Sequence, residues 1–181
     1  MSDDRPWYRE PETFVAVAAL IVSISAVVVG IYEAALQRRH DRAEVWPHLE
    51  IGTYTSPKDA KLSLQNNGIG PAIVQSIVVT VDGKPRRNWD SVLVAVAGVA
   101  NKNQETSAAG RGIRAGDAVE LLGVLRAALP PTFLDQVGRI AVHVCYTDVF
   151  GDAWTVTDTL GKRDVWRNVD RCPPQPSDAE F

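Results

Sequence analysis

The sequence has only two cysteines, and it has no surplus of positive charge. Its 181 residues include 19 Lys+Arg and 22 Asp+Glu, which give a formal net charge of −3. Two cysteines exclude a disulfide-dense scaffold. The mild acidity argues against a dedicated nucleic-acid binder, because no basic excess is present to neutralise phosphates. A chain of this length that is 45% hydrophobic suits one ordinary domain with some additional elements.

Charge is also missing from one long stretch near the start of the chain. No charged residue lies between Glu12 and Glu33. As a helix rising about 1.5 Å per residue, this stretch spans roughly 30 Å, which matches the hydrocarbon core of a bilayer. A cleaved signal peptide fits poorly because the preceding segment has more acids than bases, and a buried core helix would show a polar face. The stretch predicts a transmembrane helix over 13–36, after a short N-terminal tail, 1–12.

Basic residues follow this helix closely and bear on its orientation. Arg38, Arg39 and Arg42 lie in a juxtamembrane segment, 37–45, where they are expected to meet the membrane surface. Arg5 and Arg9 precede the helix among acidic residues. The positive-inside rule therefore favours a cytoplasmic C-terminal side. We expect a single-pass protein of the inner (cytoplasmic) membrane with a cytoplasmic soluble domain, and the opposite, periplasmic placement stays open.

Small residues recur on one stripe of the predicted helix, at spacings of three and four. A stripe of this kind lets two helix backbones approach closely, so it predicts a helix–helix interface with a second copy or another membrane subunit. The alternative is that Ala and Gly are simply common in such helices. The residues of the stripe are Ala16, Ala19, Ser23, Ala26 and Gly30.

Beyond the juxtamembrane segment, short strand patterns alternate with turn signals about every ten residues. This rhythm predicts a mainly β protein, with an antiparallel β-sandwich over 46–160 and one or two short helices. From residue 161 the chain becomes charged and forms a C-terminal tail, 161–181, whose proline-rich end, 172–181, is expected to be frayed. Strands are expected over 48–54, 61–65, 73–81, 118–125, 140–146 and 153–158.

Three segments of the domain give mixed or polar signals. The segment 90–100 is apolar and small, so either a helix capped by Asp90 or Ser91 or a buried strand fits it. The polar segment 101–112 is expected to be an exposed loop. Thr132, after two prolines, could cap a short helix over 133–137.

Three turn motifs resemble a pattern found in uncharacterised bacterial single-pass membrane proteins. The motifs are 64–72 (LQNNGIGPA), 115–117 (AGD) before a strand, and 146–151 (YTDVFG) with Trp154. In the proteins that this pattern resembles, an N-terminal helix precedes an immunoglobulin-like sandwich. The resemblance implies an architecture and supplies no activity.

The glycine-containing motifs predict turns and not phosphate loops. The NNGIGPA motif lacks the Lys and the Ser or Thr of a phosphate loop, and a strand follows it where a dinucleotide site needs a helix. We expect its asparagines to cap backbone groups, a glycine to supply positive φ, and the proline to begin an edge strand. In the second motif we expect the aspartate to accept backbone N–H bonds. These turn residues are Asn66, Asn67, Gly68, Gly70, Pro71, Asp148 and Gly151.

Two cysteines and a few ionisable residues are the remaining candidates for chemistry. His143 and Cys145 share a strand face, so they could form a nucleophile with its base, although a mixed sheet face is the favoured interpretation. A cytoplasmic domain would leave Cys145 and Cys172 reduced, whereas a periplasmic one could bond them. A metal site combining Asp148 with Asp152 and Asp158 lacks the spacing of a calcium loop.

A basic cluster of Lys84, Arg86 and Arg87 lies near Trp89. Such a cluster could bind phosphate or anionic headgroups, but a solvated loop is the favoured interpretation.

These observations favour a non-catalytic, membrane-anchored interaction module. Its expected partners are membrane lipid and other membrane proteins or further copies of itself. No nucleic acid, cofactor, metal or identifiable small molecule is expected, and no catalytic residue is assigned. The first alternative is a ligand-sensing or effector domain that controls association of the transmembrane helix, and the second is a thiol-dependent enzyme.

Overall fold

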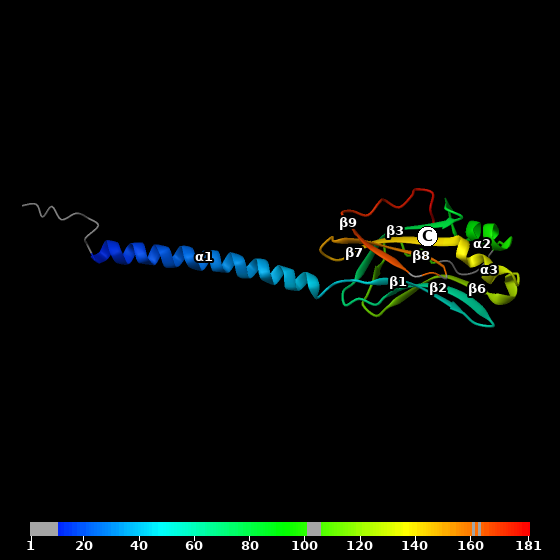
Figure 1. The fold of residues 1–181 in the computed structure, drawn as a ribbon, viewed down its shortest axis with the longest axis horizontal. Helices are drawn as coiled ribbons and strands as arrows, with labels where there is room; N and C mark the ends of the chain where they lie inside the picture. The colour runs from blue at the N-terminus through cyan, green and yellow to red at the C-terminus, as the bar shows by residue number, and fades with distance from the viewer. Residues whose placement is uncertain (1–10, 101–105, 161, 163) are drawn as a thin grey trace, which may run out of the picture. The chain divides into compact units, whose positions relative to one another are not determined.

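The computed structural model describes residues 11–100, 106–160, 162 and 164–181, and it divides into a helical unit ending at Ala43 and a domain over 44–181. Helix α1 is continuous over Pro11–Ala43 (Figure 1). The predicted transmembrane stretch and most of the basic juxtamembrane segment therefore belong to one helix. Of the N-terminal tail expected over 1–12, residues 1–10 lie outside the described residues, and Pro11 and Glu12 belong to α1.

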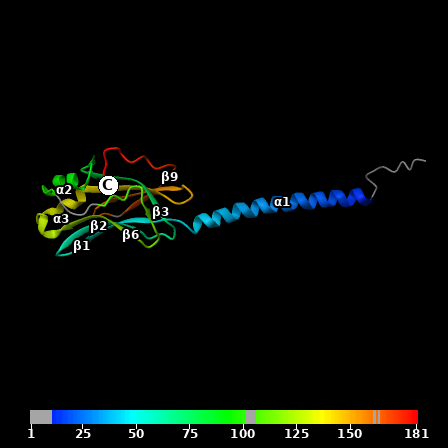
Figure 2. The same cartoon turned by 180° about the vertical axis from the view of Figure 1, so that it is seen from behind.

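The domain is built from two antiparallel sheets, which confirms the predicted mainly β class with a long N-terminal helix and short additional helices. Figures 1 and 2 show the sheets as two layers, with helices α2 and α3 at one end. The smaller sheet has the order β1-β2-β6, and the larger has β4-β3-β7-β8-β9 with β5 also paired to β3. The strands are β1 Leu49–Thr55, β2 Asp59–Asn66, β3 Ala72–Val81, β4 Lys84–Pro85, β5 Gly112–Ile113, β6 Ala118–Leu125, β7 Ile140–Thr147, β8 Ala153–Thr159 and β9 Val165–Val169.

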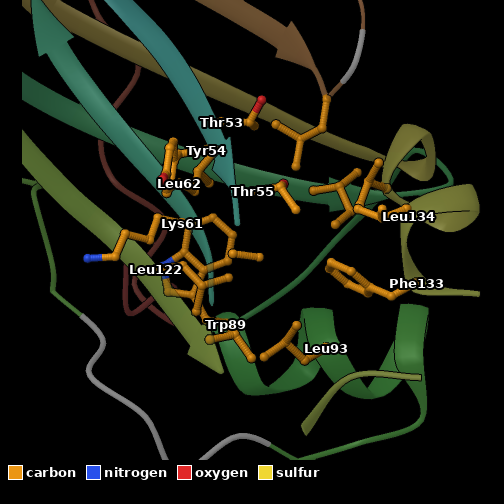
Figure 3. Close-up of a pocket in the computed structure, with 15 residues that line it drawn as sticks. Thr53, Tyr54, Thr55, Lys61, Leu62, Trp89, Leu93, Leu122, Phe133 and Leu134 are labelled. Atoms are coloured by element: carbon orange, nitrogen blue, oxygen red, sulfur yellow. The ribbon is translucent and has the colours of Figure 1, made fainter. Parts of the chain in front are cut away.

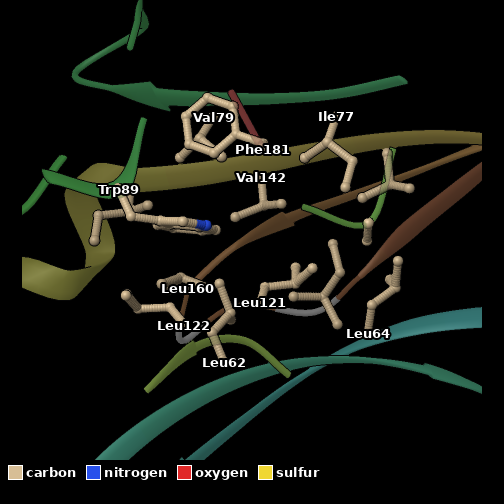
Figure 4. Packing of buried hydrophobic residues seen from close by; sticks show 14 of the residues in the cluster. Leu62, Leu64, Ile77, Val79, Trp89, Leu121, Leu122, Val142, Leu160 and Phe181 are labelled. Atoms are coloured by element: carbon tan, nitrogen blue, oxygen red, sulfur yellow. The ribbon is translucent and has the colours of Figure 1, made fainter. Parts of the chain in front are cut away.

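The core lies between the two sheets, where alternate residues of each strand face inward (Figure 4). Leu62 and Leu64 come from the smaller sheet, and Ile77, Val79 and Val142 come from the larger one. All five are less than 5% exposed. The alternation seen in the sequence therefore places one apolar face of each sheet against the other.

The ambiguous segment 90–100 contains a helix, α2 Trp89–Ala97. Its N-cap residue is Asn88, whereas the sequence predicts Asp90 or Ser91. The side chain of Asn88 accepts from the Ser91 backbone N–H, and the Ser91 side chain reciprocates as a capping box. Gly98 ends the helix with a φ of 68°.

Of the exposed loop predicted over 101–112, residues 101–105 lie outside the described residues. Residues 106–111 form a loop as expected, but Ala108 is buried in the core and Gly112 begins β5.

The second predicted helix is shorter than expected. Helix α3 covers Phe133–Gln136 and continues into a 3-10 turn, Val137–Arg139. Thr132 stands at its N-cap position but makes no side-chain capping bond. A further 3-10 turn, Arg126–Ala128, follows β6.

The C-terminal part of the chain is packed, so the expectation of a frayed tail is wrong. Beyond β9, we call residues 170–181 the strap. Cys172 is bonded to Cys145 of β7, and the Gln175 side chain accepts from the Ile77 backbone N–H at 2.7 Å. Phe181 is 2% exposed and packs edge-on against Trp89 at 5.3 Å between ring centroids. The strap thus supplies an aromatic residue to the core.

Candidate functional site

Helix α1 presents an apolar surface that no other described residue of its unit covers. Its side chains from Phe14 to Leu36 are exposed, including those of the small-residue stripe. Ser23 and Ser25 donate to backbone carbonyls four residues earlier, which satisfies their hydroxyls within the helix. A helix with this length and composition suits a single membrane span. Arg38 and Arg39 are exposed near its end, and the Arg42 side chain lies outside the description.

An apolar cavity of about 140 Å³ opens at the end of the sandwich that carries α2 and α3. Figure 3 shows Thr53 and Thr55 of β1 on one side and Phe133 and Leu134 of α3 on the other. Both sheets and both helices contribute to its wall. The other lining residues are Tyr54, Ala60, Lys61, Leu62, Trp89, Leu93, Leu122, Val124, Val137, Ile140 and Leu160.

Strand β1 is an edge strand, and the described residues of the domain cover only its first half. The His48 carbonyl accepts from the Asn67 backbone N–H, so the even-numbered residues of β1 direct their backbone groups toward β2. The N–H and C=O groups of residues 49, 51, 53 and 55 therefore point away from β2. Leu49 bonds through its N–H to the Tyr146 hydroxyl and through its carbonyl to Trp166 Nε1. Along the second half, Thr53 and Thr55 have no such backbone bond with any described residue.

Two carboxyl groups lie where the covered half of β1 ends. Asp164 Oδ2 accepts from the Ile51 backbone N–H at 3.1 Å. Asp158 of β8 is 3% exposed, and its Oδ1 has no hydrogen-bond partner in the described chain. Burial, together with the neighbouring charge of Asp164, raises the pKa of Asp158 to about 6. Burial likewise raises the pKa of Asp164.

The NNGIGPA motif is a buried turn centred on one asparagine. Asn66 is 0% exposed, and its Oδ1 accepts from the backbone N–H groups of His48 and Gly68. Its Nδ2 donates to the carbonyls of Gly70 and Ile113. The exposed Asn67 donates its side-chain amide to Glu50.

Neither glycine of this motif adopts positive φ, so that expectation is wrong. They are needed for close backbone approach. A Cβ on Gly68 would lie 2.4 Å from the His48 nitrogen, and one on Gly70 would lie 1.9 Å from the Val45 carbonyl oxygen. Pro71 precedes β3, whose outer side is covered at its ends by the short strands β4 and β5.

The YTDVFG motif is a tight turn between β7 and β8. Asp148 is 3% exposed, and its Oδ1 accepts from the N–H groups of Phe150 and Asp152 at 2.8 and 2.9 Å. Gly151 has a φ of 87°, which favours glycine. Asp158 lies on β8 and not in this turn. Across the described residues, no three His, Cys, Asp or Glu side chains gather in a way that could hold a metal ion.

Cys145 and His143, the pair considered for thiol chemistry, make other contacts in the structure. Cys145 is in a disulfide with Cys172 and has no free thiol. His143 lies on the outer face of the larger sheet, where its Nδ1 is 3.0 Å from the Thr157 hydroxyl, and burial lowers its pKa.

The basic cluster near Trp89 does not form a stacking surface, because Trp89 is buried in the core. Arg87 instead pairs with Glu180 of the strap.

The chain matches no protein-family model, no curated protein and no solved structure.

Proposed function

We propose that this protein is a non-catalytic, membrane-anchored β-sandwich module that works as an accessory subunit of a membrane complex or as a homo-oligomer. The observation that carries the proposal is the join between an uncovered apolar helix and a domain with its own core. The helix supports membrane lipid as one partner. The domain and the small-residue stripe support protein partners, either other membrane proteins or further copies of this chain. The immunoglobulin-like and bacterial assignments remain predictions.

We also propose that the domain faces a compartment in which disulfides persist. Reducing agents in the cytoplasm keep thiols reduced, whereas bonded pairs are stable outside it. The bond between Cys145 and Cys172 therefore favours the periplasmic or extracellular side. This proposal departs from the placement predicted by Arg38, Arg39 and Arg42. The charge rule is a bias, and here it compares three arginines after the helix with two before it.

Chemical cross-linking in native membranes, followed by isolation of the full chain, tests the interaction module. We expect a stoichiometric complex, either with a second membrane protein or with copies of the chain. Recovery of monomer alone, at every cross-linker length, would contradict the proposal. Ala26→Ile tests the stripe, and Ala18→Ile on another face of the helix is its matched control. A complex lost in the first variant and kept in the second would assign the contact to the stripe.

A further inference from the structure

We propose that the uncovered half of β1 and the adjoining cavity form one docking site for an extended peptide segment of a partner protein. The segment would add to β1 as an antiparallel strand and place an apolar side chain in the cavity. A basic residue two positions further along it would face Asp158 and Asp164. This inference rests on the proposed interaction function and names its binding site and the class of partner.

The backbone of β1 supplies the first half of the site. Thr53 and Thr55 direct their N–H and C=O groups outward, and both residues are exposed. An unpaired edge of this kind is a template for a further strand. The same edge is closed at Leu49 and Ile51 by side chains of the larger sheet. The unpaired edge at Thr53 and Thr55 therefore accepts a short segment, and the closed positions fix one end of that segment along β1.

The cavity supplies the second half. On β1 the inward positions change from Leu49 and Ile51, which are buried, to Thr53 and Thr55, which are exposed and line the cavity. In an antiparallel pair, a residue opposite Thr53 directs its backbone to β1 and its side chain to the same face as Thr53. Its side chain would therefore enter the cavity. A cavity of about 140 Å³ is close to the size that holds a benzene molecule, so it suits a Leu or Phe side chain.

The carboxyl groups add a charge preference. The next inward-facing residue of the added strand, two positions toward its C-terminus, would reach the closed end of the edge beside Ile51 without bonding to the Ile51 backbone. Asp164 already binds the Ile51 N–H there, and Asp158 has an oxygen without a partner in the described chain. A Lys or Arg at that position would supply both a positive charge and N–H donors. All the strand pairs in both sheets are antiparallel, which supports this direction for the added strand.

Synthetic peptides test the site on the full-length protein in nanodiscs, with fluorescence anisotropy as the readout. The probe is a fluorescein-labelled seven-residue peptide, TTTLTKT, in which the central Leu would enter the cavity. We expect Leu→Gly to weaken binding at least tenfold. Moving the Lys to the other side of the Leu (TKTLTTT) should weaken binding several-fold. N-methylation of the Leu amide should abolish binding because that N–H faces β1, whereas N-methylation of the following Thr, which faces away, should have little effect.

Two further measurements place the peptide on the protein. Hydrogen exchange of the Thr53 and Thr55 amides should slow when the peptide binds, while the Tyr54 amide, already bonded to β2, should not change. Ala60→Phe fills the cavity and should weaken binding at least tenfold, with Gln65→Phe on the exposed face of β2 as its matched control. If Ala60→Phe does not fold, the comparison between the two N-methylated peptides on the wild-type protein decides the question.

The contrary outcomes separate a failure of the docking site from a failure of the proposed interaction function. Absence of peptide binding up to millimolar concentration, or binding that ignores N-methylation, would overturn the inference. Decanoate displacing the peptide with no dependence on the peptide backbone would identify the cavity as a lipid-chain site, and this too would overturn it. If the cross-linked complexes persist in Ala60→Phe membranes, the docking site is wrong and the interaction function stands. If wild-type membranes give monomer only, the function itself fails.

Discussion

At the scale of single residues, a buried amide and a buried carboxyl behave in opposite ways. Asn66 uses its side-chain amide to satisfy four backbone groups at the start of the domain. Asp158 is equally buried and leaves an oxygen without a partner among the residues described. A satisfied buried polar group stabilises a fold, whereas an unsatisfied charge costs free energy and is retained where something else requires it. The docking site proposed above would give Asp158 such a partner.

Replacing Asn66 should show how much the turn depends on it. Asn66→Ala removes four hydrogen bonds and leaves buried donors and acceptors unpaired, so we expect a loss of about 3 kcal/mol in the free energy of unfolding. The neighbouring Asn67→Ala loses a single exposed bond to Glu50 and should cost less than about 0.5 kcal/mol. Urea unfolding of the detergent-solubilised chain measures both. Equal effects in the two variants would contradict this account of the turn.

Asp158 should make stability depend on pH in a particular direction. Its pKa is raised to about 6 in the folded chain, so between pH 4 and pH 6 the folded state binds more protons than the unfolded state. Stability from this group is therefore lost as pH rises through about 6. Asp158→Asn should be more stable than the wild type at pH 7.5, by up to roughly 3 kcal/mol because each pKa unit is worth about 1.4 kcal/mol. The difference in stability between the variant and the wild type should shrink toward pH 4.5. Thermal unfolding of both proteins at pH 7.5 and pH 4.5 measures it, and an equal difference at the two pH values would contradict this expectation.

At the scale of elements, the strap holds three separate parts of the domain. It is bonded to β7 at Cys145, accepts from the β3 backbone through Gln175, and reaches the core through Phe181. Glu180 adds an ion pair with Arg87, which lies just before α2, and this pair lowers the pKa of the Glu180 carboxyl. The strap therefore closes the outer side of β3 between the short strands β4 and β5.

Truncating the last aromatic side chain tests whether the strap belongs to the core. Phe181→Ala should cost about 3–4 kcal/mol, since it removes a buried ring packed on Trp89. Asp178→Ala, at an exposed position of the strap, should be close to neutral. Differential scanning calorimetry of both variants gives the comparison. A neutral Phe181→Ala would mean that the end of the chain does not pack as described.

The sequence predicts those elements whose stability is local. The hairpin of β7 and β8 is recognisable because both strands alternate and Asp148 and Gly151 form its turn between them. The strap is not recognisable, because a proline-rich polar segment has no periodicity and its contacts with the rest of the domain are long-range. The role of the glycines at 68 and 70 also escapes the sequence, since the backbone that crowds them lies about twenty residues earlier. The uncovered half of β1 follows from the sheet order, which the turn spacing alone does not give.

At the scale of the whole chain, an apolar helix is joined to a disulfide-bonded domain. The helix predicts attachment to a bilayer, and the disulfide favours a compartment outside the cytoplasm. With the domain on that side, the docking site proposed at β1 would meet partners that are also exported or anchored there. The arginines that follow the helix predict instead that the domain lies on the cytoplasmic side of the membrane.

Protease accessibility in sealed right-side-out membrane vesicles tests this placement most directly. We expect external protease to remove the domain over 44–181 while α1 stays in the membrane fraction. In vesicles not treated with protease, we expect non-reducing mass spectrometry to find Cys145 bonded to Cys172. Full protection of the domain in sealed vesicles, with digestion only after the membrane is opened and with both thiols free, would contradict the account.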